Sequence, residues 1–74
     1  MESNTVKTTL ETIGFGREFT VTFTKTDGTQ RTMRCMMEPP TGPIKNPNVV
    51  PVMDVDKGAW RSFKVDSVIE ITYS

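Results

Sequence analysis

Apolar and polar side chains alternate most regularly in residues 18–25. Phe19, Val21 and Phe23 are separated from one another by threonines, and a period of two is typical of a strand that buries one face. We therefore expect a strand here whose three apolar side chains belong to the core.

A turn is expected after this strand, at residues 26–28. A two-residue loop would set Val21 opposite Arg34, mixing core and surface positions, whereas a three-residue loop sets it opposite Met33. The favoured register pairs Phe23 with Arg31, Val21 with Met33 and Phe19 with Cys35. This loop requires Gly28 in the left-handed region, in a glycine bulge after a type I turn.

A second hairpin is predicted from residues 49–55 and 59–65, around a turn at Lys57 and Gly58. With those two residues as the loop, apolar side chains face apolar side chains across the strands, and an acidic side chain faces a basic one. The predicted pairs are Val52 with Phe63, Asp54 with Arg61 and Val55 with Trp60.

Residues 6–14 are predicted to form a short helix, because Val6, Leu10 and Ile13 recur at spacings of four and three. Candidate caps stand at both ends, Asn4 or Thr5 at the start and Gly14 at the end. Several threonines lower the helix propensity of this segment, so a strand or a loosely ordered arm is the alternative.

Residues 38–48 hold four prolines and one glycine, which predicts a long loop. Pro40 and Pro43 have the spacing of a polyproline ligand, although a stiffened connection between strands is the favoured interpretation. A last strand is expected over residues 68–73, with Ile69, Ile71 and Tyr73 on one face. Five short strands favour a small barrel, because closure removes exposed sheet edges.

The composition limits the chemistry that this chain can perform. The 74 residues form one domain, with residues 1–16 as a helix or arm and residues 17–74 as the barrel. There is no histidine and only one cysteine, which excludes imidazole bases, disulfide frameworks and the common zinc sites. We expect no enzymatic activity, no catalytic residues, no metal and no cofactor.

The lack of a long apolar stretch and the single cysteine together predict a cytoplasmic protein. No stretch approaches the roughly 18 apolar residues of a membrane span, so we expect no membrane partner. A single thiol suits a reducing compartment. A domain this small has little surplus stability from one core, which favours association with itself or with a partner.

Nine basic side chains balance nine acidic ones over the whole chain. This neutrality argues against a strong polyanion binder. The charges are unevenly distributed, however, because residues 31–64 carry six basic and three acidic side chains. A weak contact with nucleic acid therefore remains open.

Two stretches carry a resemblance to a known family. They are residues 23–35, with FTKTDG followed by RTMRC, and residues 55–68, VDKGAWRSFKVDSV. Together they resemble the small phage-borne family described as WYL-like, with an Sm-like SH3 β-barrel fold. The resemblance implies a five-stranded SH3-like barrel and a phage origin, and hence the cytoplasm of an infected host. The larger WYL domains of bacterial transcription regulators, which are similar in the barrel, are associated with nucleic acids or nucleotide-like ligands.

The candidate nucleic-acid-binding set combines cationic side chains with one aromatic, since guanidiniums hold phosphates and an exposed aromatic stacks on a base. The set consists of Arg31, Arg34, Trp60, Arg61 and Lys64. Alternation along the strand separates Trp60 from Arg61 and Phe63. The favoured interpretation is that Trp60 and Phe63 pack in the core and that Arg61 pairs with Asp54.

A second candidate surface is formed by methionines, which adapt to irregular partners; they are Met33, Met36, Met37 and Met53. Met33 is expected in the core, whereas Met36 falls on the opposite face, beside Arg34. The candidate partner-binding set is Met36, Met37, Pro40 and Pro43. Cys35 is expected to be a buried apolar residue, and Asp54 and Asp56 are expected to cap a turn rather than bind a metal.

Two functions compete on these grounds. One is a small non-enzymatic phage accessory protein with weak single-stranded nucleic-acid binding or a regulatory role. The alternative is an interaction module that binds and modifies a host protein during infection.

Overall fold

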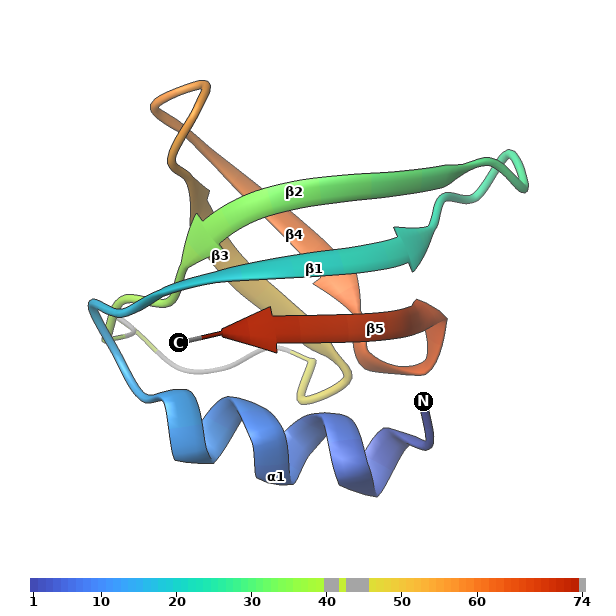
Figure 1. Ribbon diagram of the computed structural model, residues 1–74, viewed down its shortest axis with the longest axis horizontal. Coiled ribbons are helices and arrows are strands. Elements are labelled where there is room, and N and C mark those ends of the chain that lie inside the picture. The colour runs from blue at the N-terminus through green and yellow to red at the C-terminus, as the bar shows by residue number, and fades with distance from the viewer. Residues whose placement is uncertain (40–41, 43–45, 74) are drawn as a thin grey trace.

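The computed structural model describes residues 1–39, 42 and 46–73, which fold into one helix and one antiparallel sheet (Figure 1). The elements in chain order are α1 Ser3–Ile13, β1 Glu18–Thr24, β2 Gln30–Met36, β3 Val49–Asp54, β4 Ala59–Lys64, the short 3₁₀ helix η1 Val65–Ser67, and β5 Val68–Tyr73. The five expected strands are therefore confirmed.

The sheet has the strand order β4-β3-β2-β1-β5 and is strongly bent. In Figure 1, β3 and β4 run obliquely behind β1, β2 and β5, while α1 lies along β5. Strands β2 and β3 are joined by only two residue pairs, Cys35 with Asp54 and Met36 with Met53. This short pairing allows the sheet to fold over. The order leaves β4 and β5 as the sheet edges, and no strand pairing joins them in the part of the chain that the structure describes.

The core fills the space between the two halves of the sheet and the helix. Its buried apolar side chains are Val6, Leu10, Ile13, Phe19, Val21, Phe23, Met33, Cys35, Met37, Val52, Phe63, Val65 and Val68. Phe23 and Phe63 stack with their ring centroids 5.8 Å apart, so the core joins the two hairpins directly. No described helix is long and apolar enough to cross a membrane.

The first hairpin has the predicted register. Val21 pairs with Met33, Phe19 with Cys35, and Phe23 with Arg31. Lys25 and Thr29 close the loop through a 2.7 Å hydrogen bond from the Lys25 N–H to the Thr29 carbonyl. Gly28 has a φ of 89°, which an L-amino acid with a side chain rarely adopts.

The register predicted for the second hairpin is wrong by two residues. Val52 pairs with Arg61, Met53 with Trp60, and Asp54 with Ala59, so four residues form the loop. The reason is the Asp54 carboxylate, whose Oδ1 accepts the N–H groups of Asp56 and Lys57, each at 3.1 Å. The Gly58 N–H also donates to the Asp54 carbonyl at 2.8 Å, so this one residue organises the wider turn.

A register shift in β5 decides which of its side chains are buried. The pairing with β1 shifts between Thr22 and Phe23, so that Phe23 pairs with Val68. Val68 is therefore buried and Ile69 is exposed. Tyr73, which pairs with Phe19 in the unshifted part of the strand, is also exposed. Alternation alone could not reveal the irregularity.

The helix is confirmed, including the burial of Val6, Leu10 and Ile13 and the end at Gly14. The predicted caps at its start are wrong, because α1 begins at Ser3 after Glu2 and has no side-chain cap. The hydroxyls of Thr9 and Thr12 donate to carbonyls four residues earlier. Such bonds do not stabilise a helix, so it is the packing of the apolar face that offsets the low helix propensity of threonine.

The described residues of the 38–48 segment form no helix or strand, as the prolines predict. Pro40 and Pro43, both named as partner-binding candidates, lie outside the described residues.

Replacing Leu10 by alanine is expected to lower the free energy of unfolding by about 2 to 5 kcal/mol, because a buried leucine leaves a cavity. Urea denaturation measures this change. Thr8, which is exposed on the same helix, is the matched control, and Thr8→Ala is expected to change stability by less than about 0.5 kcal/mol. Equal effects of the two substitutions would show that α1 does not pack into the core.

Candidate functional site

The sheet distributes the five nucleic-acid-binding candidates over two faces. Arg31 and Arg61 belong to the inner face, because they alternate in step with the buried Met33 and Phe63. Arg34, Trp60 and Lys64 fall on the outer face, out of step with those core residues. The structure therefore does not bring the five side chains onto one surface.

Trp60 is solvent-exposed rather than part of the core. Its exposed fraction is 57%, so the expectation that it packs inside is wrong, whereas Phe63 is buried as expected. The cause is that Trp60 lies on the outer face of β4, out of step with the buried Phe63, and no described helix or strand covers that face (Figure 1). A large exposed aromatic side chain on an edge strand is more typical of a contact surface than of a residue that stabilises the fold.

Three apolar side chains form a continuous row across the outer face. Met36 of β2 pairs with Met53 of β3, and Met53 pairs with Trp60 of β4. Side chains directly opposite each other on adjacent strands lie on the same face of a sheet. We call Met36, Met53 and Trp60 the outer-face row.

From the sequence, Met53 was counted among the methionines of the second candidate surface but not in its partner-binding set. Trp60 was assigned to the nucleic-acid set, so Met36 was not connected to Trp60 through Met53. Alternation with the buried Val52 places Met53 on the outer face. Its alignment with Met36 depends on the β2–β3 pairing, which a long loop leaves undetermined.

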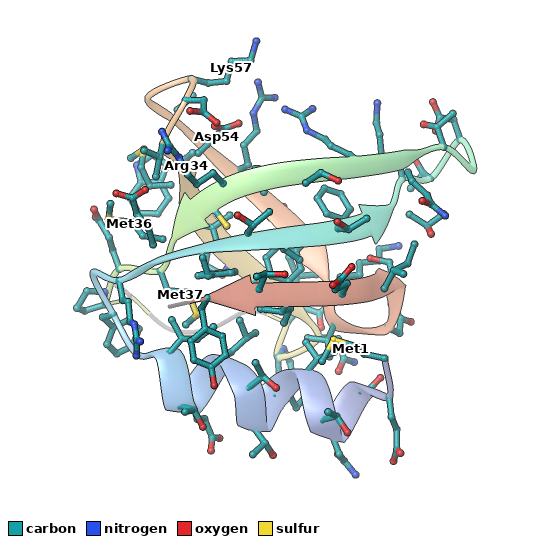
Figure 2. The ribbon with its side chains drawn as sticks, viewed as in Figure 1. Met1, Arg34, Met36, Met37, Asp54 and Lys57 are labelled. Atoms are coloured by element: carbon teal, nitrogen blue, oxygen red, sulfur yellow. The ribbon has the colours of Figure 1, made fainter. Side chains whose placement is uncertain are left out.

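Met37 does not belong to a binding surface. It is buried in the core, and its carbonyl accepts the Gly16 N–H at 2.8 Å. Figure 2 shows Met36 at the periphery of the sheet and Met37 between the sheet and the helix. Its proposed partner contact is therefore wrong, because β2 ends at Met36 and a bridge to Phe15 follows.

The charges beside the outer-face row are largely paired. The Arg34 guanidinium contacts the Asp56 carboxylate at 2.9 Å and the Glu18 carboxylate at 3.4 Å. All three side chains are at least half exposed, so these pairs contribute little to stability. They do reduce the positive potential that Arg34 presents to a phosphate. Lys64, by contrast, forms no ion pair within the described ranges.

The inner face holds a buried carboxylate near two guanidiniums. Asp54 Oδ2 lies 3.5 Å from an Arg31 Nη and 4.0 Å from Arg61 Nε. The predicted pairing of Arg61 with Asp54 is thus confirmed, although the two residues are not directly opposite each other. Arg31 joins them from β2.

The predicted turn-capping role of Asp54 is likewise confirmed by its bonds to the N–H groups of Asp56 and Lys57. Within residues 1–39, 42 and 46–73, no three metal-ligating side chains gather in one place.

Cys35 is fully buried beside this carboxylate, as the sequence predicts. Burial, and to a smaller extent the negative charge of Asp54, raises the pKa of the Cys35 thiol to about 12. A thiol that stays protonated is a poor nucleophile, which agrees with a packing role.

Comparisons with known proteins place these features in a family context. The family described as WYL_2, Sm-like SH3 beta-barrel fold, matches residues 10–69. The chain is also similar to a protein of Enterobacteria phage T4 described as "Uncharacterized 11.5 kDa protein in Gp31-cd intergenic region". The two are 36% identical over 63 residues, covering 69% of this chain and 62% of the relative's length. No solved structure matches the chain.

The Cys35 thiol makes a testable contribution to stability at alkaline pH. Because its pKa is about 12 in the fold and about 9.0 as a free side chain, the unfolded chain releases this proton first. The stabilisation is complete below about pH 9 and is lost as the pH rises toward about 12, by at most about 1.4 kcal/mol per pH unit. Urea denaturation at increasing pH measures the slope.

Cys35→Ala is the matched variant for this measurement. It is expected to be less stable near neutral pH, because packing is lost, but its stability should fall less steeply above pH 9. Parallel slopes for the two proteins would contradict the prediction.

Proposed function

This chain belongs to the family of small phage-borne WYL-like proteins with an Sm-like SH3 β-barrel fold, and on that premise we propose that it is a non-enzymatic protein that binds another protein through its outer-face row. The observation that carries the proposal is the alignment of Met36, Met53 and Trp60 across three strands, ending in an exposed tryptophan.

The chemistry of the row suits a protein partner. Tryptophan is the side chain most often found to dominate protein interfaces, and methionine adapts its shape to an irregular partner surface. The flanking Arg34, Asp56 and Glu18 provide a polar rim around an apolar centre, which is the usual anatomy of an interface. In an infected cell, a host protein is the expected class of partner.

Weak single-stranded nucleic-acid binding is the second candidate. It is favoured by one observation: Trp60 and Lys64 lie on the same face of β4, and Lys64 has no ion-pair partner among the described side chains. A base could stack on the indole while the ammonium contacts a phosphate. Neutral overall charge and the paired state of Arg34 place this function second.

Trp60→Ser is expected to weaken capture of a protein partner at least tenfold, because truncating a central interface tryptophan typically costs about 2 kcal/mol or more. The measurement is quantitative affinity capture from nuclease-treated host lysate, followed by binding of the purified partner. Ile69→Ser is the matched control, since Ile69 is an exposed apolar residue of the opposite sheet edge.

Three outcomes separate the explanations for the capture experiment. Selective loss in the Trp60→Ser protein supports the proposal. Equal recovery by both variants contradicts it. Recovery that disappears after nuclease treatment points to nucleic acid, and light scattering of the purified chain shows whether the partner is a second copy.

The nucleic-acid candidate has a direct optical test, because Trp60 is the only tryptophan. Single-stranded DNA or RNA stacking on its ring is expected to quench its fluorescence at low salt. Lys64→Gln should weaken binding and reduce its salt dependence by about one counterion. Lys25→Gln, which alters an exposed lysine of the other hairpin, serves as control. Unchanged fluorescence at tens of micromolar protein would remove this candidate.

A further inference from the structure

The inner face carries a second feature that the outer-face row does not use. Arg31 and Arg61 both approach the same oxygen of Asp54, at 3.5 Å and 4.0 Å, so the two guanidiniums are neighbours although they come from different hairpins. Neither donates a hydrogen bond to any residue that the structure describes. We call these three side chains the arginine cluster.

The contacts of Asp54 leave the positive charges of Arg31 and Arg61 only partly neutralised. Its side chain is only 4% exposed, and its Oδ1 accepts two backbone N–H groups of the turn. Only Oδ2 therefore faces the arginines, and one negative charge stands against two positive charges. Asp54 attracts both guanidiniums without accepting a hydrogen bond from either, so their N–H donors remain available to a ligand.

A recess of about 110 Å³ opens next to this cluster. That volume is several times what a single water needs. Its lining residues are Arg31, Thr32, Met33, Asp54, Asp56 and Lys57. Figure 2 shows Lys57 at the tip of the β3–β4 turn, with Asp54 and Arg34 nearer the strands, so the lysine among the lining residues stands at the outer rim of the recess.

We propose that the arginine cluster and Lys57 bind the phosphate group of a small phosphate monoester. The guanidinium fork matches phosphate geometry and forms charge-assisted hydrogen bonds. The recess and the ion pairs around it join four cations to three carboxylates, since Arg34 pairs with both Asp56 and Glu18. The excess of one positive charge favours a phosphate anion.

This site goes beyond the proposed protein contact and does not depend on it. The outer-face row lies on the opposite face of β4, since Trp60 and Arg61 are adjacent in the strand and point to opposite sides. Asp54 acts here as a positioning residue, because its Oδ2 faces both arginines and its Oδ1 already accepts two backbone N–H groups.

Nuclear magnetic resonance titration of the full chain tests the proposal. The probes are inorganic phosphate, a nucleoside 5′-monophosphate and a single-stranded oligonucleotide without terminal phosphate, with sodium chloride matched for ionic strength. Both small phosphates are expected to shift the signals of the Asp56 and Lys57 amides and of the Arg31 and Arg61 guanidiniums. Signals of the outer-face row should stay in place.

Matched variants make the assignment specific. Arg31→Gln and Arg61→Gln should each weaken binding of both small phosphates at least tenfold, and Lys57→Gln about threefold. Lys7→Gln, which removes an exposed charge from α1, should leave affinity unchanged. Because the wild-type shift map is independent of the variants, a variant that fails to fold does not prevent the test.

Three results would overturn the proposal. The first is a set of shifts spread evenly over the exposed lysines, and the second is equal affinities in the Arg31→Gln and Lys7→Gln proteins. The third is binding of the oligonucleotide alone with shifts centred on Trp60, which would support the nucleic-acid candidate instead.

Discussion

The buried carboxylate of Asp54 fixes the geometry on which both candidate surfaces depend. By accepting two N–H groups of the β3–β4 turn, it widens the loop to four residues and sets Met53 opposite Trp60. The same carboxylate faces Arg31 and Arg61 with its second oxygen. A polar group this well buried is tolerated because every part of it has a partner. One side chain thus determines what each face of the hairpin presents.

The bend of the sheet explains how so small a chain presents two different chemistries. The inner faces of the two hairpins meet in the core, where Phe23 stacks on Phe63, and α1 closes the side next to β5. No described helix or strand covers the outer face of β2, β3 and β4, which keeps an apolar row (Figure 1). Near the β3–β4 turn, the inner face carries the cationic side chains of Arg31 and Arg61 in place of apolar ones. The barrel is a scaffold shared by its family, and these local placements are what give this chain its particular surfaces.

Membership of a phage family and an Sm-like SH3 β-barrel fold agree with what the individual residues show. A chain without histidine, with a protonated buried thiol, offers none of the usual nucleophile and base pairs. Its exposed tryptophan and adaptable methionines suit recognition. The proposed activity is therefore binding, with shape and apolar contact on one face and phosphate chemistry at the other.

The sequence by itself determined the elements that local patterns specify. Alternation of Phe19, Val21 and Phe23 predicted β1, and the spacing of Val6 and Leu10 predicted the buried face of α1. Matching apolar positions across the turn at residues 26–28 predicted the register of the first hairpin. Only the tertiary structure decided the β3–β4 register, the shift in β5, the burial of Met37 and the alignment of Met36 with Trp60. These depend on a side-chain cap, on an edge strand without cover and on a β2–β3 pairing across a long loop, and none of them leaves a periodic signal in the chain.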